Sequence, residues 1–196
     1  MTPEEYNIVK ASPKFTDINV ERILPYPDGN PGFYFVHLRY VDNVDEVFGA
    51  EKAAREVLRE TPLTIAGQPV KVRYSYLDSD FQDESIALVF DNDPFTVAKT
   101  LETNPFVIEM TFPKPRTLSG FSIIIGSAKI QITLKCYDET SAEPTVYTFE
   151  GQGTQNQPEL SFDLPQPTET QILHVEVLDS NSHDQAKVHI WELKLR

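Results

Sequence analysis

Residues 129–137 read Lys-Ile-Gln-Ile-Thr-Leu-Lys-Cys-Tyr, an alternation of polar and mostly apolar side chains. Successive side chains of a β-strand point to opposite faces, so this pattern predicts a strand with one buried face. Cys136 occupies an apolar position of the alternation, which indicates a small buried hydrophobe and not a nucleophile. Six similar short stretches follow residue 85 and are separated by polar loops: 106–112, 120–125, 145–150, 160–164, 172–178 and 187–195. This spacing predicts an antiparallel β-sandwich over residues 86–196.

The chain before residue 86 has a different pattern of predicted elements. Residues 1–18 are polar, contain two prolines and are expected to form a loose N-terminal arm. A small α+β unit with the order ββαββ is predicted at 19–77, with an aromatic run at 33–35 in its core. Its expected elements are strands at 19–24 and 33–41, a helix through 43–60 and a hairpin at 63–76. The acidic segment 78–85 is predicted to link the two parts, so the chain as a whole is expected to be mainly β.

Composition excludes several classes of function. The formal net charge is −13, which repels phosphate backbones and anionic lipid, so neither nucleic acid nor a membrane surface is an expected partner. A single cysteine excludes an internal disulfide and a cysteine-based metal cluster. No apolar run approaches the roughly 20 residues that cross a bilayer, and the first residues lack the pattern of a signal peptide.

Two segments carry chemical information. Residues 90–96, Phe-Asp-Asn-Asp-Pro-Phe-Thr, offer carboxylate, hydroxyl and carbonyl oxygens within one turn, and calcium prefers such ligands. In the final strand Glu192 interrupts an apolar run, where a carboxylate is costly unless it is paired or bound to a cation. The alternative is a solvated turn capped by its own side chains, which Glu192 holds through hydrogen bonds to backbone amides without any metal.

Together these segments resemble the galactose-binding-like β-jelly roll, the fold of discoidin domains, coagulation-factor type C domains and many carbohydrate-binding modules. Such domains open with an apolar stretch, Asp-Gly-Asn/Asp, two variable residues and Thr, and they close with a strand in which Glu lies between apolar residues. In this chain Asn92 takes the place of the glycine, and Val97-Ala98 stand where a tryptophan is common. The resemblance implies a structural calcium ion. Its implied ligands are side chains and, at the third motif residue and the residue before the glutamate, backbone carbonyls: Asp91, Asp93, Thr96, Trp191 and Glu192.

The resemblance also implies a non-catalytic binding or accessory module for a neutral glycan, held by loops at one end of the sandwich. His183 is the candidate ligand-binding residue, and an ordinary solvated loop is the alternative for its segment. The sequence shows no nucleophile–base pair, glycine-rich phosphate loop or Gly-x-Ser-x-Gly turn, so no catalytic residue is predicted.

Two alternatives remain open at this point. One is a scaffold or protein-interaction domain, for example the extracytoplasmic part of a membrane protein such as a cell-envelope glycosyltransferase. The other is an enzyme whose catalytic residues come from the first unit. If the chain is a fragment of a longer protein, an extracytoplasmic or cell-surface location is expected.

Overall fold

The computed structural model describes residues 1–78, 85–138, 143–156, 158–183 and 186–196, and it divides into two compact units, Met1–Ala54 and Arg55–Arg196. The predicted linker at 78–85 lies mostly outside the described residues. Its first residue, Asp78, is buried and forms ion pairs with Lys99 at 3.1 Å and Lys187 at 2.5 Å, so it belongs to the larger unit. No helix in the described ranges has the length and apolar character needed to cross a membrane.

The smaller unit begins with helix α1 (Pro3–Ala11), where the sequence analysis expected a loose arm. That expectation was wrong because Thr2 and Glu5 form a capping box. The Glu5 amide donates to Thr2 Oγ1 at 3.2 Å, and the Thr2 amide donates to Glu5 Oε2 at 2.7 Å. Pro3 supplies the fixed backbone angle that favours the first helical position.

Strands β1 (Phe15–Pro25) and β2 (Pro31–Tyr40) form the predicted antiparallel hairpin, and helix α2 (Val44–Glu56) follows. The Tyr34 ring stacks on Tyr6 of α1 with centroids 4.7 Å apart. Phe33 and Phe35 are 47% and 51% exposed, so the prediction of a buried aromatic run holds for neither of them. A two-stranded hairpin offers too little area to bury both of its faces.

The second hairpin, β3 (Arg59–Ile65) and β4 (Gln68–Tyr74), belongs to the larger unit, contrary to the predicted ββαββ unit. Strand β4 pairs with β6 (Phe106–Ile124) from Lys71 to Tyr74, and its apolar residues Val70 and Val72 lie in the core. Strand β3 is at the edge of the sheet, where a proline such as Pro62 is tolerated.

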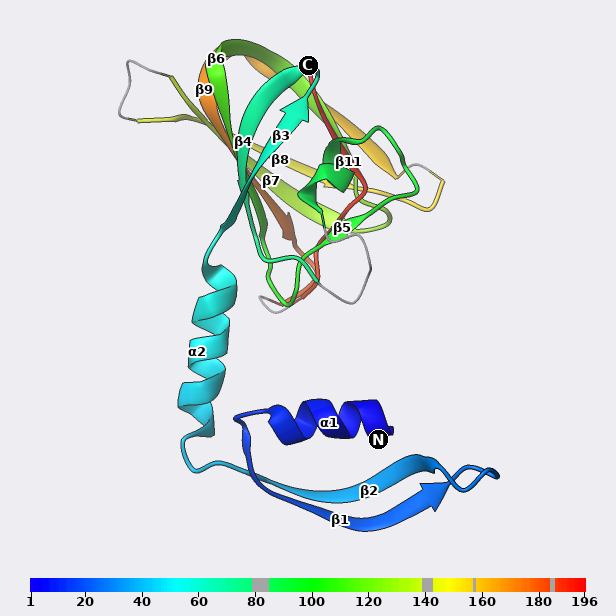
Figure 1. Ribbon diagram of the computed structural model, residues 1–196. Coiled ribbons are helices and arrows are strands. Elements are labelled where there is room, and N and C mark those ends of the chain that lie inside the picture. The colour runs from blue at the N-terminus through cyan, green and yellow to red at the C-terminus, as the bar shows by residue number, and fades with distance from the viewer. Residues whose placement is uncertain (79–84, 139–142, 157, 184–185) are drawn as a thin grey trace. The chain divides into compact units, whose positions relative to one another are not determined.

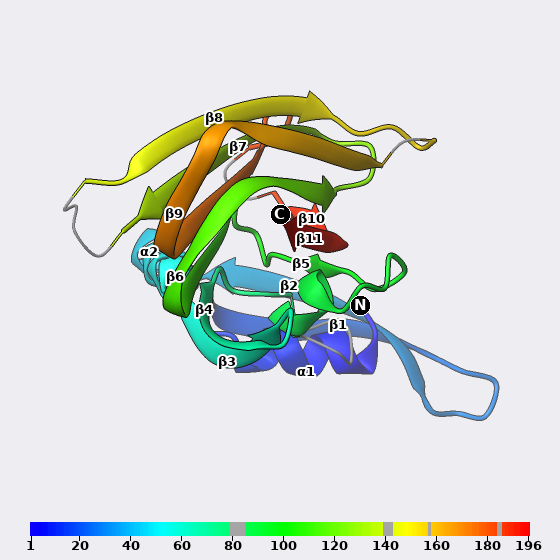
Figure 2. The same cartoon turned by 90° about the horizontal axis from the view of Figure 1, so that it is seen from above.

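The larger unit is a β-sandwich, as predicted, and its main sheet has the order β3-β4-β6-β9-β7-β8, with β11 paired to β6. Its remaining elements are η1 (Ile86–Phe90), β5 (Ala98–Lys99), β7 (Lys129–Tyr137), β8 (Thr145–Gln152), β9 (Glu159–Asp179), β10 (His189–Ile190) and β11 (Glu192–Leu195). Strands β6 and β9 are long and run side by side (Figure 1). Strand β6 takes the place of the strands predicted at 106–112 and 120–125, and β9 takes the place of those predicted at 160–164 and 172–178. Seen from above, they curve around β5, β10 and β11 (Figure 2).

The core lies on the concave face of this curved sheet. Phe121, Phe149 and Phe162 pack with ring centroids 5.1–5.4 Å apart. Cys136 is buried as predicted, and burial raises the pKa of its thiol, which disfavours the reactive thiolate.

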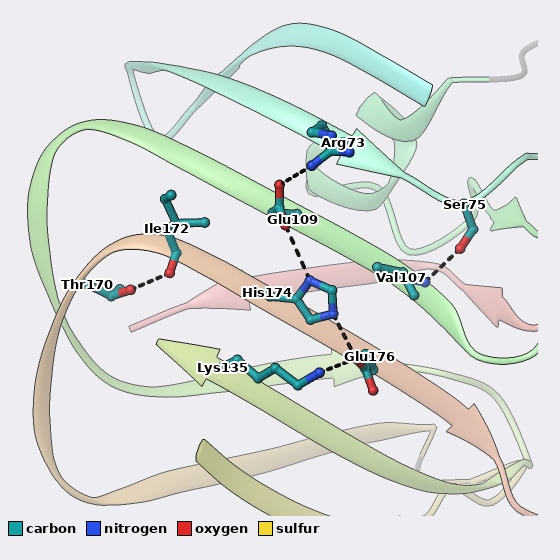
Figure 3. Close-up of polar contacts among 9 residues, drawn as sticks. All are labelled: Arg73, Ser75, Val107, Glu109, Lys135, Thr170, Ile172, His174 and Glu176. Carbon is teal, nitrogen blue, oxygen red and sulfur yellow. Dashed lines mark hydrogen bonds and ion pairs between the residues drawn. The ribbon is translucent and has the colours of Figure 1, made fainter. Parts of the chain in front are cut away.

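The opposite face of the sheet carries a row of four charged side chains and one histidine across four strands (Figure 3). Arg73 Nη1 donates to Glu109 Oε1 at 2.9 Å, and the His174 ring bridges Glu109 Oε2 at 3.5 Å and Glu176 Oε1 at 2.8 Å. Lys135 Nζ completes the row at 2.7 Å from Glu176. Burial opposes ionisation of Glu176, but the Lys135 and His174 contacts lower its pKa on balance. These contacts join β4, β6, β9 and β7, and each charged group has a partner within the row.

Candidate functional site

The turn after η1 brings Asp91, Asp93 and Thr96 together. Asn92, which stands where the resembled motif has glycine, has a φ of +62°, a left-handed conformation that asparagine tolerates. The Asp93 amide donates to Asp91 Oδ1 at 2.8 Å, and the Thr96 hydroxyl donates to Asp91 Oδ2 at 2.9 Å. The Asp93 carboxylate turns toward its own loop, where Oδ1 accepts from the Phe95 amide at 3.0 Å. The Asp93 backbone carbonyl is also engaged, because it accepts from the Thr96 hydroxyl at 3.0 Å and from the Thr96 amide at 3.3 Å.

Strand β11 delivers Glu192 to this turn. The Glu192 side chain is 2% exposed, and its Oε2 has no hydrogen-bond partner among the residues that the structure describes. Desolvation raises the pKa of Glu192, and the nearby Asp91 charge raises it further. Lys194 and hydrogen bonds from the Asn92 and Leu193 amides favour the charged form without reversing the shift. The pinned-turn alternative accounts for the amide contacts but leaves one buried carboxylate oxygen unexplained.

These observations partly fit a calcium ion. A buried carboxylate oxygen without a partner, close to a second carboxylate and a hydroxyl, is an oxygen-rich setting of the kind calcium takes. The described ranges contain no cluster of three or more His, Cys, Asp or Glu side chains that could hold a metal, so backbone carbonyls would have to complete the shell. The metal itself stays a prediction.

A pocket of about 260 Å³ lies beside this turn. The indole of Trp191 forms part of its wall, and Trp191 is half-buried. The pocket combines this aromatic ring with proline and aliphatic carbon and with hydroxyl and amide groups: Pro94, Ile124, Gly126, Ser127, Thr154, Gln155, Pro158 and Trp191. An aromatic wall with a few polar groups is typical of small-ligand sites.

Two glycines allow the loops beside Trp191 to approach closely. A Cβ at Gly126, whose φ is +66°, would lie 3.2 Å from Trp191 Cζ3, and a Cβ at Gly153 would lie 1.9 Å from the Gly126 carbonyl oxygen. The backbones of the two loops therefore leave no room for a side chain at Gly153, and at Gly126 the positive φ and the tight contact with the indole both favour glycine. The sequence analysis did not predict this pocket. Gly153, directly after β8, was nevertheless a signal for a close approach of two backbones.

The structure does not bring His183 to this pocket. His183 is exposed in the turn after β9, and its backbone carbonyl accepts hydrogen bonds from Asn104 Nδ2 at 3.2 Å and from the Ala186 amide at 3.0 Å. It is not among the residues that line the Trp191 pocket. The geometry thus gives His183 a place in the loop scaffold, and its role as a ligand-binding residue stays a prediction.

Comparison with known proteins identifies the fold. No family model and no curated protein matches the sequence. Among solved structures, a Ruminococcus gnavus GH29 fucosidase in complex with fucose matches with a TM-score of 0.55 and 15% identity, over 80% of this chain and 30% of that one. A pectin-binding carbohydrate-binding module matches with a TM-score of 0.51 and 13% identity, over 69% and 92% of the two chains. The CBM32 of AlyQ in complex with 4,5-unsaturated mannuronic acid matches with a TM-score of 0.51 and 14% identity, over 69% and 98%.

The larger unit is a galactose-binding-like jelly roll. Two carbohydrate-binding modules match over 92% and 98% of their own length, which confirms the predicted fold. The chain spans less than a third of the fucosidase. These structural matches show the fold of the larger unit, and at 13–15% identity they leave its ligand to be argued from its own residues.

Proposed function

We propose that this protein is a non-catalytic carbohydrate-binding module that holds a neutral glycan in the Trp191 pocket. The observation that carries the proposal is the placement of the chain's single tryptophan, half-buried, in a small pocket with hydroxyl and amide groups. The face of a sugar ring is rich in C–H groups that pack on an indole, while its hydroxyls need hydrogen-bonding partners such as Ser127 and Gln155. The fold also occurs in a pectin-binding module and in a module that binds 4,5-unsaturated mannuronic acid, and this occurrence supports a glycan ligand.

The proposal includes a structural calcium ion beside the pocket. Asp91, Thr96 and Glu192 would hold it through their side chains, and Asp93 and Trp191 through their backbone carbonyls. A bound divalent cation would neutralise the buried Glu192 carboxylate and fix the loop that ends in Thr96. Because Trp191 precedes Glu192 directly, the same ion would steady the aromatic wall of the pocket. A glycan ligand also favours an extracytoplasmic or cell-surface location for the longer protein of which this chain would be a part.

Replacing Trp191 with alanine should weaken glycan binding at least tenfold, which corresponds to about 1.4 kcal/mol. The measurement is a glycan-array screen of the purified chain, followed by isothermal titration calorimetry with the best neutral sugar. Gln155→Ala should also weaken binding, and because Gln155 is exposed this variant leaves the core intact. Tyr26→Ala, which removes an exposed aromatic ring from the smaller unit, is the matched control. Equal loss in the Tyr26 and Trp191 variants would contradict the assignment.

The second candidate function is a protein-interaction domain, and the smaller unit favours it. Its hairpin exposes several large apolar side chains, and exposed apolar surface of this kind marks interaction sites: Ile23, Leu24, Tyr26, Phe33, Phe35 and Tyr40. This function would use the smaller unit and so would be compatible with glycan binding by the larger one.

A further inference from the structure

A second pocket lies at the bend of β6, away from Trp191. It has a volume of about 440 Å³, within the range of small-ligand sites. Residues 112–117 of β6 form one side and the β3–β4 turn forms the other. Arg116 and Ile124 are eight residues apart on the same strand, which separates the two pockets by about 25 Å along it.

Two cations mark this pocket. Arg116 is half-buried and Lys114 is exposed, and both line the cavity. Within the described ranges neither side chain has an ion pair, although acidic residues outnumber basic ones by 30 to 17. Glu169 lies opposite Thr117 in the β6–β9 ladder but forms no ion pair with Arg116. The pocket is thus a cationic spot on an acidic protein.

The Arg116 guanidinium is held in position. Its Cζ lies 5.1 Å from the ring centroid of Phe112, which is buried and therefore fixed. Stacking on a ring leaves the N–H groups at the guanidinium edge free to bind, and their fork matches the two oxygens of a carboxylate. Such a bidentate contact gives orientation as well as affinity.

The walls around Arg116 are rigid. Pro113 and Pro115 restrict the backbone of β6 on one side. On the other side Ala66 and Gly67 have φ of +49° and +77°, the tight two-residue turn that suits a hairpin. A preformed pocket loses little conformational entropy when it binds a ligand. Ile65 and the prolines supply apolar wall, and Gln68 and Thr117 supply hydrogen-bonding groups.

We propose that this pocket is a second saccharide site, specific for a sugar that carries a carboxylate, such as a uronic acid residue of a polysaccharide. The carboxylate would contact Arg116 and Lys114, the hydroxyls Gln68 and Thr117, and the C–H face of the ring the apolar wall. A net charge of −13 opposes long polyanions of any kind, so the site suits an isolated or short uronic acid segment, whose carboxylate meets the two local cations Arg116 and Lys114. The inference extends the proposed function to another ligand class, but the site itself does not use Trp191.

The test is calorimetric titration of the full chain with a trimer of galacturonic acid and with the methyl ester of the same trimer. The ester keeps the shape of the sugar and removes its charge. The free acid should bind at least tenfold more tightly than the ester, and 0.5 M salt should weaken the binding of the acid alone. Arg116→Gln should weaken binding of the acid at least tenfold. The affinity of Arg116→Lys for the acid should lie between those of Arg116→Gln and the wild type, because lysine keeps the positive charge but lacks the paired N–H groups of the guanidinium.

Lys129→Gln is the matched control, since it removes one exposed positive charge near the Trp191 end of the sheet. It should leave acid binding unchanged, and so should Trp191→Ala, which separates this proposal from the neutral-glycan site. Equal binding of acid and ester would overturn the inference, as would equal effects of Arg116→Gln and Lys129→Gln. Inorganic phosphate that competes at the same concentration as the trimer would also overturn it, because the pocket would then recognise any anion. Thermal melts followed by circular dichroism confirm that each variant is folded.

Discussion

A fragment of residues 86–196 should lose most of the cooperative thermal transition that the fragment Arg55–Arg196 shows. The longer fragment keeps β3 and β4, whose Val70 and Val72 are 3% and 0% exposed. Full burial of a valine side chain contributes about 1.5–3 kcal/mol, so the two account for about 3–6 kcal/mol. Native domains have a total stability of only about 5–15 kcal/mol.

Removal of the hairpin also opens the edge of β6. The Ser75 amide donates to the Val107 carbonyl at 3.0 Å, the Val107 amide donates to Ser75 Oγ at 2.9 Å, and Arg73 pairs with Glu109 (Figure 3). Circular dichroism melts of the two fragments and the full chain measure the effect. The fragment Arg55–Arg196 should melt close to the full chain, because it retains the described core. A fragment of residues 86–196 that melted within a few degrees of it would show that the hairpin is dispensable.

Calcium should raise the melting temperature by several degrees over that in chelator. A ligand that binds only the native state stabilises it by about 2.7 kcal/mol at a hundredfold excess over Kd. In a domain of this size each kcal/mol shifts the melting temperature by about 2–4 °C. Magnesium should have a smaller effect, because it holds its water and requires a regular octahedron. Glu192→Gln should remove most of the shift, whereas Glu150→Gln, which alters an exposed glutamate of β8, should keep it.

The pH dependence of the melting temperature tests the role of Glu192 independently of calcium. The folded state raises the pKa of Glu192, chiefly through desolvation, so it binds a proton more readily than the unfolded chain does. In chelator the contribution of Glu192 to stability therefore falls as the pH rises from the unfolded to the folded pKa. Glu192→Gln removes this cost and should melt no lower than the wild type at neutral pH without metal. The calcium shift needs the ionised carboxylate and should fade on acidification. Identical wild-type melting in calcium and in chelator would establish the metal-free pinned turn.

The sequence predicts the jelly roll well because its strands alternate regularly and its two motif segments are local. The Asp91 turn and Glu192 lie about 100 residues apart, and a family resemblance was needed to bring them together. The second hairpin was assigned to the wrong unit because its alternation shows that it has a buried face but does not specify the partner, which is β6. The α1 helix was missed although Thr2 and Glu5 have capping-box spacing, because the segment has no apolar stripe to indicate a helix.

The pockets were the least predictable features. The Trp191 pocket depends on the contact between the backbones at Gly126 and Gly153, which come from different loops. The Arg116 pocket depends on the bend of β6 and on the β3–β4 turn, which forms its other side. Both are set by tertiary packing, which a single sequence does not encode as a local pattern.

Trp191 itself can report whether a glycan binds in the pocket that it lines. The chain has one tryptophan, so its intrinsic fluorescence reports on the proposed pocket wall alone. The full chain is titrated, at constant calcium, with the neutral glycan that binds best on the array. If the glycan binds against Trp191, the emission should show a saturable blue shift with a midpoint equal to the calorimetric Kd, because the sugar displaces water from the indole. Glycan binding that releases heat but leaves the Trp191 emission unchanged would contradict binding in the Trp191 pocket.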